Sequence, residues 1–337
     1  MFKALQELQI GEDVGQGVLL QIKRKKGALK LSEQAFKVSQ GLLSYEELTK
    51  LCEEQVKEDD HQEPLAIRTV TDNLEEIINV SYTEQGYRWR LNCLNISLGS
   101  LRAGDFGFIF ARPETGKTTF LASEIGHFLL GSSRPIILFN NEEQGTKVML
   151  RVYQAFFGVT IDVLLSNPSR YQAEFRERTK GNFKLFDSAT ISRREVESIV
   201  RDVQPGVVVY DQLPKIKGFS NDRDDLRLGS IFQWARELAK GSHAAIGVCQ
   251  ADGHAEGVRY LTMEHVANAK TAVQAEADWI LGIGRSNDTG TEYVRYLNIS
   301  KNKLMGDKDS ISDLRHGRFE VLIKPEIARY MDVVKYD

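Results

Sequence analysis

Short apolar runs alternate with amphipathic helical stretches from about Gly86 onward. The runs span residues 106–111, 135–140, 182–187, 206–211, 244–250 and 279–284. Each run is nearly continuous in apolar residues, which is typical of a strand that is buried on both faces of a parallel sheet. Strands and helices in alternation predict an α/β domain with a mostly parallel sheet. Residues 292–303 and 317–334 instead alternate apolar and polar side chains, which predicts an antiparallel extension.

The first 60 residues follow a different pattern, rich in charge. Apolar residues recur at helical spacing in 32–43 and again in 44–58, where Ser44 and Glu47 have the spacing of a capping box. We therefore expect a small, mainly helical N-terminal domain over residues 1–60.

A polar segment that ends in Pro64 then predicts a linker. Residues 69–80 predict one short helix, with Asp72 as its N-cap. A single short helix cannot bury its apolar side alone, so we expect it to dock on another surface. This divides the chain into the helical domain, a linker with a docking helix at 61–85, and the α/β domain at 86–337.

Composition narrows the possible partners. The formal net charge of −3 excludes a globally basic nucleic-acid binder, so such a partner must meet a local basic surface. Cys52, Cys93 and Cys249 are far apart and form no CxxC pair, which favours a reducing compartment over a disulfide framework or a thiolate zinc site. The N-terminus has no continuous apolar stretch, and no run reaches the ~18 residues that span a bilayer. We expect a cytoplasmic protein with no membrane partner.

The segment between the first strand and the following helix carries the candidate chemistry. It reads ARPETGKTT, and Gly-Lys-Thr between a strand and a helix is the context of a phosphate-binding loop. Backbone N–H groups of residues 114–118 would face phosphates, Lys117 would reach the β- and γ-phosphates, and the Thr118 hydroxyl would bind Mg²⁺. Ala111 stands where the usual motif has glycine, and its small side chain lets the loop close. The predicted nucleotide-binding residues are Ala111, Arg112, Pro113, Glu114, Thr115, Gly116, Lys117, Thr118 and Thr119.

Polar side chains at the ends of other strands complete an ATPase-like set. Asp211 ends the 206–211 run and is predicted to hold Mg²⁺ from a neighbouring strand. Glu142 and Glu143 follow the 135–140 run beside the loop, and one of them, preferably Glu142, would act as general base. Gln250 ends the 244–250 run, where its amide would sense the γ-phosphate.

The order of five motifs resembles the DnaB-like replicative helicases, the RecA-fold ring helicases of superfamily 4. The motifs are ARPETGKTTF, FNNEE, VVVYDQL, GVCQ and VQAEADWIL, and the lead-in RLNCLNISLGSLRAGD is similar as well. The resemblance covers about residues 86–335, and it makes Ala111 a family feature. It implies a RecA-like P-loop NTPase core that uses ATP, or another NTP or dNTP, with Mg²⁺. It also implies a homohexameric ring that moves along single-stranded DNA and unwinds a forked duplex.

The same resemblance implies a basic pair, Lys-x-Arg, that a neighbouring subunit donates to the nucleotide. Lys301 matches the lysine, but Lys303 stands where the family has its arginine finger. Lysine is a point charge and lacks the bidentate fork of arginine. Either Lys303 substitutes, with slower hydrolysis, or another residue serves.

DNA contacts are expected from the loops that follow Asp211 and Gln250. The basic residues there, predicted to contact DNA phosphates, are Lys215, Lys217, Arg259 and Lys270. Aromatic residues are sparse in both loops, which favours tracking of the DNA backbone over base stacking. The chain has no CxxC pair, and its N-terminal region is too short for a primase fold. The resemblance therefore implies a separate primase and polymerase, and the compact build resembles a phage replication protein.

Two other functions stay open. A RecA/RadA-like recombination ATPase would hydrolyse nucleotide and bind DNA without unwinding forks. A loader or regulator that uses ATP as a switch would show negligible DNA-stimulated turnover, and the lysine at position 303 is compatible with it. The ending VQAEAD and the LN-G lead-in favour the ring helicase.

Overall fold

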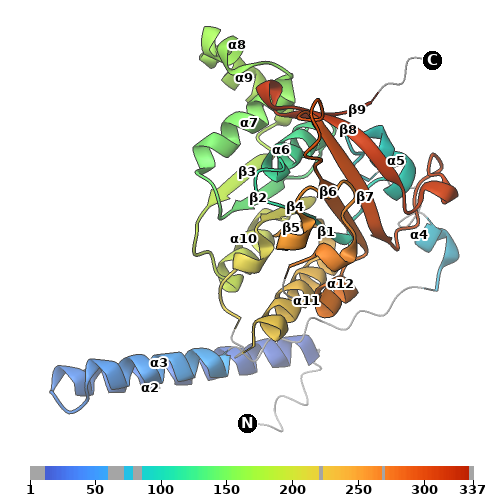
Figure 1. Cartoon of the computed structure of the whole chain (residues 1–337). Coiled ribbons are helices and arrows are strands. Elements are labelled where there is room, and N and C mark those ends of the chain that lie inside the picture. The colour runs from blue at the N-terminus through green and yellow to red at the C-terminus, as the bar shows by residue number, and fades with distance from the viewer. Residues whose placement is uncertain (1–11, 60–71, 79–85, 220–222, 268–269, 334–337) are drawn as a thin grey trace. The chain divides into compact units, whose positions relative to one another are not determined.

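The computed structural model describes residues 12–59, 72–78, 86–219, 223–267 and 270–333 (Figure 1). The chain forms two compact units, Met1–Asp72 and Asn73–Asp337. The smaller unit holds α2 (Glu12–Ser39) and α3 (Tyr45–Asp59), so the predicted helical character of this region is confirmed. The predicted domain boundaries at residues 60 and 85 lie outside the described residues and stay predictions.

The capping box before α3 is present as predicted. The Glu47 backbone N–H donates to Ser44 Oγ at 3.2 Å, and the Ser44 N–H donates to Glu47 Oε2 at 2.9 Å. The next helix is α4 (Leu74–Ile78), and the remaining ends of the predicted segment, 69–71 and 79–80, lie outside the described residues. Its cap is Asn73, whose Oδ1 accepts the Glu75 N–H at 3.0 Å, so the prediction of Asp72 was wrong by one position.

A sheet of nine strands organises the larger unit, in the order β3-β2-β4-β5-β1-β6-β7-β8-β9. The strands β1 to β6 pair in parallel, and β7 to β9 extend the sheet in antiparallel fashion, as the sequence predicts. Their bounds are β1 Phe106–Ala111, β2 Ile136–Asn140, β3 Phe183–Asp187, β4 Val207–Asp211, β5 Ala244–Gln250, β6 Trp279–Gly284, β7 Val294–Asn302, β8 Arg318–Lys324 and β9 Arg329–Asp332.

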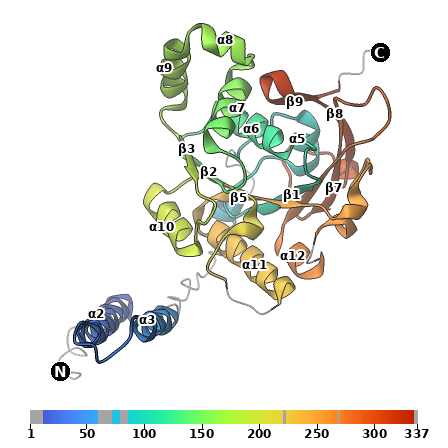
Figure 2. The ribbon, with the colours of Figure 1, turned by 60° about the vertical axis from the view of Figure 1, so that its left-hand side comes forward.

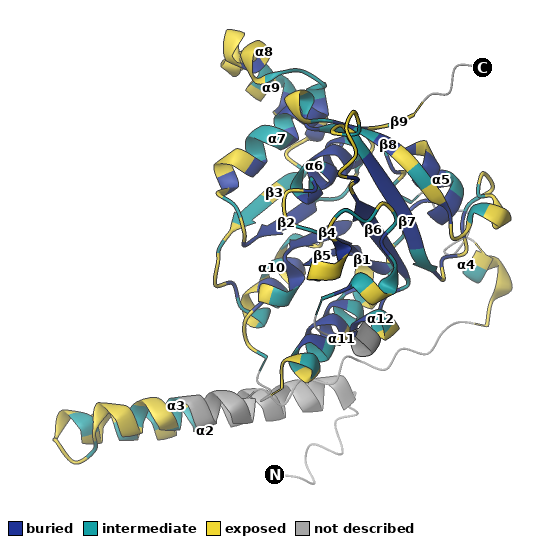
Figure 3. Ribbon diagram, in the orientation of Figure 1, coloured by how far each residue is buried: buried dark blue, intermediate teal, exposed yellow. Residues whose placement is uncertain are grey.

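Helices cover both faces of this sheet (Figure 2). One core cluster joins the sheet to the face with α5, α6 and α7, and a second joins it to the face with α10, α11 and α12. Burial from both sides explains why β1 and β6 are apolar throughout and why β2 and β4 are apolar up to their last residues, Asn140 and Asp211, and Figure 3 shows these strands as buried. The helix bounds are α5 Asn92–Leu98, α6 Lys117–Phe128, α7 Gly145–Phe157, α8 Ile161–Ser166, α9 Pro168–Thr179, α10 Arg193–Val203, α11 Asp224–Ser242 and α12 Lys270–Glu276. No helix within the described ranges has the length and apolar character that crossing a membrane requires.

The strand order changes one expectation about the site. The strand next to β1 is β5, in a register that pairs Ala111 with Gln250, and β4 and β2 lie beyond it. The strand β4, which ends in Asp211, and the strand β2, which Glu142 follows, are therefore not direct neighbours of β1 and its phosphate loop. Because the carboxyl ends of parallel strands meet at one edge, their terminal side chains still converge there.

Candidate nucleotide site

The loop between β1 and α6 has the backbone of a tight anion-binding turn. Glu114 (φ 59°) and Gly116 (φ 105°) adopt left-handed conformations. A Cβ on Gly116 would lie 2.7 Å from Ile323 Cδ1 and 2.9 Å from the Tyr330 hydroxyl, so a side chain there meets both a strained backbone and a clash. Ala111, by contrast, is an ordinary buried residue at the end of β1 and needs no glycine.

Lys117 opens α6 and points back into the loop. Its ammonium donates to the Arg112 carbonyl at 3.0 Å and to the Ala111 carbonyl at 3.2 Å, and the residue is only 8% exposed. Burial lowers the pKa of Lys117, while the carboxylates of Glu142 and Asp211 oppose that shift. A desolvated ammonium inside a loop of backbone N–H groups is a strong site for a phosphate.

Asp211 is a buried carboxylate without a partner among the described residues. It ends β4 with none of its surface exposed, and neither of its carboxylate oxygens accepts a hydrogen bond. Burial, assisted by the negative charge of Glu142, raises the pKa of Asp211 to about 6, and Lys117 works in the opposite direction. An orphaned acidic oxygen of this kind fits a hard cation such as Mg²⁺, which accepts one or two carboxylates plus the oxygens of a substrate phosphate.

Glu142 faces the same edge of the sheet, and three donors surround its carboxylate. The Gln212 amide donates to Oε2 at 2.6 Å, the Gln250 amide donates to Oε1 at 3.5 Å, and Lys215 Nζ lies 3.9 Å from Oε1. Glu143 instead pairs with Arg151 of α7 at 2.6 Å. The geometry therefore favours Glu142 over Glu143 as the candidate base.

Sequence reasoning missed Gln212, which directly follows Asp211. Its backbone is left-handed (φ 65°), which is unusual for a residue other than glycine, and it is 3% exposed. Its carbonyl accepts the Asn141 side-chain amide at 3.1 Å, so this strained turn ties the end of β4 to the end of β2. The only signal in the sequence is a polar residue directly after a strand end.

Arg295, which begins the buried part of β7, was also missed. Its Nε donates to the Thr115 carbonyl at 2.6 Å, and the buried Tyr330 hydroxyl donates to the Gly116 carbonyl at 3.3 Å. Burial lowers the pKa of Arg295 and raises the pKa of Tyr330. These two side chains hold the phosphate loop through contacts that are too distant in the sequence to leave a local pattern.

Lys301 and Lys303 do not approach the loop of their own chain. Because β7 runs antiparallel, Lys301 pairs in register with Ile280 near the start of β6, at the opposite edge of the sheet from the loop. The Lys301 ammonium donates to the carbonyls of Gln274 and Ala275, and burial together with Lys303 lowers its pKa. Any role for this pair at a nucleotide requires a second subunit.

Three of the four predicted DNA-contact residues have described side chains, and each has different surroundings. Lys215 lies close to Glu142. Lys217 is exposed, and its backbone forms an isolated β-bridge with Ser192. Arg259 pairs with Asp288 and packs over the ring of Tyr296, at 5.5 Å from its centroid. The side chain of Lys270 lies outside the described part of the structure.

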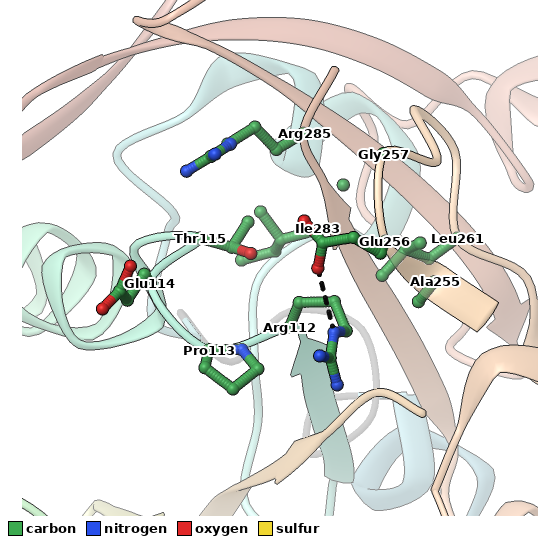
Figure 4. Close-up of a pocket in the computed structure, with 11 residues that line it drawn as sticks. Arg112, Pro113, Glu114, Thr115, Ala255, Glu256, Gly257, Leu261, Ile283 and Arg285 are labelled. Atoms are coloured by element: carbon green, nitrogen blue, oxygen red, sulfur yellow. Dashed lines mark hydrogen bonds and ion pairs between the residues drawn. The ribbon is translucent and has the colours of Figure 1, made fainter. Parts of the chain in front are cut away.

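A cavity of about 210 Å³ lies beside the loop (Figure 4). Arg112 extends there and pairs with Glu256 at 3.2 Å, while it also donates to the Ala251 carbonyl at 3.3 Å. The phosphate loop is thus in direct contact with the segment that follows Gln250, one of the two predicted DNA loops. The cavity is lined by Arg112, Pro113, Glu114, Thr115, Ala255, Glu256, Gly257, Leu261, Ile283, Gly284 and Arg285.

Comparison with known proteins yields relatives by sequence, although no family model matches this chain. The replicative DNA helicase DnaB of Buchnera aphidicola is 25% identical over 227 residues, which is 63% of this chain and 45% of that protein. The DnaB of Haemophilus influenzae is 25% identical over 162 residues, 44% of this chain and 34% of that protein. The matches span less than half the length of these curated relatives.

Solved structures show the same fold. One of them, an isolated ATPase domain, superposes with a TM-score of 0.63 at 16% identity, covering 77% of this chain and 95% of that one. A DnaB-like replicative helicase, whose structure was described with its interactions with primase, gives 0.65 at 15% identity, covering 95% and 78%. The RecA-like core predicted from the sequence is confirmed.

Proposed function

We propose that this chain, which is homologous to the DnaB replicative helicases, is an NTP-driven DNA helicase that forms a ring and moves along single-stranded DNA. One observation carries the proposal. Four different strand ends bring Lys117, Asp211, Glu142 and Gln250 to one edge of the sheet, around a loop whose backbone suits phosphates. This set provides an anion-binding ammonium, a candidate cation ligand, a base and an amide donor.

Each side chain has a defined task in hydrolysis. The ammonium of Lys117 binds the β- and γ-phosphates and stabilises the charge that spreads over their oxygens. Glu142 accepts a proton from the attacking water, and the Gln250 amide donates to the γ-phosphate. Asp211, with the hydroxyl of Thr118, would hold Mg²⁺, which when bound neutralises phosphate charge. ATP, or another NTP or dNTP, is the proposed substrate.

The proposed ring is argued from the position of the basic pair Lys301 and Lys303. In one chain these lysines lie at the far edge of the sheet, so we place them at the nucleotide of an adjacent copy in a homohexamer. Apolar side chains available for such contacts are exposed on α4 and on α8. They are Leu74 and Ile78 on α4, and Ile161, Val163 and Leu165 on α8.

Single-stranded DNA is proposed to contact the loops that carry Lys215, Lys217, Arg259 and Lys270. Contacts to phosphates of this kind fix position rather than sequence, as a motor on arbitrary DNA requires. We assign priming and polymerisation to separate proteins. The proposal also places the protein in the cytoplasm and its gene in a phage.

The test compares DNA-stimulated NTP hydrolysis and unwinding of a forked duplex in the wild type and in Lys117→Ala. The matched control is Lys184→Ala, which removes an exposed lysine on β3. Loss of both activities in Lys117→Ala alone would support the helicase. Hydrolysis without unwinding in the wild type would favour a recombination ATPase. NTP binding without stimulated hydrolysis would favour an ATP-gated loader.

A further inference from the structure

The predicted DNA-contact residue Lys215 and the candidate base Glu142 are neighbours. Lys215 Nζ lies 3.9 Å from Glu142 Oε1, although the two residues belong to different strand-end loops. Their side chains are 44% and 31% exposed, so the pair is accessible from solvent. An electrostatic contact therefore joins a residue predicted to bind DNA to the residue predicted to act as general base.

Buried neighbours and a hydrogen bond anchor the backbone around Lys215. Lys215 ends a short 3₁₀ turn, Leu213–Lys215, between the fully buried Leu213 and the 1% exposed Ile216. The Pro214 carbonyl accepts a hydrogen bond from Arg227 of α11 at 3.2 Å. The four-carbon side chain of a lysine on such a turn is flexible, so its ammonium can reach either of two nearby anions, here the Glu142 carboxylate or a phosphate.

The Glu142 carboxylate is crowded in this arrangement. A carboxylate offers about four lone-pair sites, and an attacking water needs one of them in good geometry. The Gln212 amide takes Oε2 at 2.6 Å, while Lys215 and Gln250 both approach Oε1. If Lys215 moves away, Oε1 keeps, among the described residues, the Gln250 contact at 3.5 Å, the outer limit for a hydrogen bond.

We propose that Lys215 couples DNA binding to hydrolysis: in the absence of DNA it holds Glu142 in an ion pair, and a single-strand phosphate draws the ammonium away and frees the carboxylate. Gln212 is a positioning residue that keeps Glu142 oriented after Lys215 has left. This inference rests on the proposed function and adds to it the means by which DNA regulates the nucleotide site.

The experiment measures NTP hydrolysis without DNA and with saturating oligo-dT, for the wild type, Lys215→Ala and Lys215→Arg. Partly exposed ion pairs contribute little, so Lys215→Ala is expected to raise the DNA-free rate about two- to five-fold and to lower the stimulation ratio by a similar factor. Lys215→Arg keeps the charge and is expected to keep the low DNA-free rate. Lys215→Met, which keeps the apolar stem, provides a second charge-removing variant.

Lys240→Ala serves as the matched control, because it breaks an exposed lysine–glutamate pair, Lys240 with Glu237 at 2.7 Å, on α11. It is expected to leave both rates unchanged. A DNA-free rate in Lys215→Ala and Lys215→Met that equals or falls below the DNA-free rate of the wild type would overturn the coupling and leave the helicase standing. A wild type without NTP hydrolysis under either condition would instead overturn the proposed function, and the coupling with it.

Discussion

Replacing Asp211 with asparagine tests whether the ionised carboxylate of Asp211 destabilises the folded protein. The carboxylate is fully buried and has no hydrogen-bond partner among the described residues, so its charge is poorly solvated. Burial raises its pKa from 3.8 to about 6. Each pKa unit corresponds to 1.36 kcal/mol, so ionised Asp211 costs the folded state about 3 kcal/mol.

The sign of the effect sets the pH window. Below the unfolded pKa of 3.8 the group is protonated in both states and costs nothing. Stability is lost as the pH rises from about 4 to about 6, and the full penalty persists above this range. Asp211→Asn is therefore expected to melt close to the wild type at pH 4 but above it at pH 7.5. For a unit of this size, 3 kcal/mol corresponds to roughly 6–12 °C.

The assay is thermal unfolding of both proteins at the two pH values, with the exposed Asp202→Asn as a control that should change neither melting temperature. Adding Mg²⁺ and a non-hydrolysable NTP should stabilise the wild type and narrow the gap, because a cation satisfies the carboxylate that asparagine lacks. An asparagine variant that melts at or below the wild type at pH 7.5 would refute the argument that Asp211 is an unsatisfied charge.

Three further predictions concern the loop, the finger position and the assembly. Gly116→Ala places a Cβ against the Tyr330 hydroxyl and is expected to lower the free energy of unfolding, measured by chemical denaturation, by about 1–3 kcal/mol. The control is Gly104→Ala, where φ is also positive but nothing lies within 4 Å of the added Cβ, and its loss should be smaller. Equal losses in the two variants would contradict the clash. Lys303→Arg is expected to raise the turnover number of DNA-stimulated hydrolysis with little change in KM, and an unchanged rate would show that Lys303 does not act as the finger. Deleting residues 1–81 is expected to abolish hexamers in light scattering, and intact rings would disprove the role of the linker.

Much of the fold could be predicted because its strands are buried on both faces. The bounds of β1, β5 and β6 match the sequence prediction, and β2, β3 and β4 each begin one residue later than predicted. A continuous apolar run marks such strands plainly, whereas the order in which they pair depends on crossovers that no local pattern records. This is why strands next to the loop were expected to carry Asp211 and to precede Glu142, whereas Asp211 ends β4 and Glu142 follows β2, both beyond β5.

The site divides along the same physical line. Candidate residues at a strand end, such as Gln250, or in the turn and helix start that follow a strand, such as Lys117, could be predicted from position and chemistry. Arg295 and Gln212 could not, because one supports the loop through a contact across the sheet and the other depends on a left-handed turn that side-chain periodicity does not reveal. The contact between Lys215 and Glu142 could not be predicted either, because it joins two loops that are far apart in the sequence.

The strand β7 has a mechanical consequence. Arg295 near its beginning contacts the loop of its own subunit, whereas Lys301 lies near its end and Lys303 just beyond it, at the opposite edge of the sheet. The extended chain from Arg295 to Lys303 covers about 27 Å at the rise of a β-strand. β7 pairs with β8 over Val294–Asn298 and with β6 over Tyr296–Asn302, so the strand is hydrogen-bonded to a neighbour along its whole length, with one register shift against β6 near its end. In the proposed ring, this strand would connect the loop at one nucleotide to the finger position at the next, and we expect a shift of the loop to move that position, which would let the subunits hydrolyse in sequence.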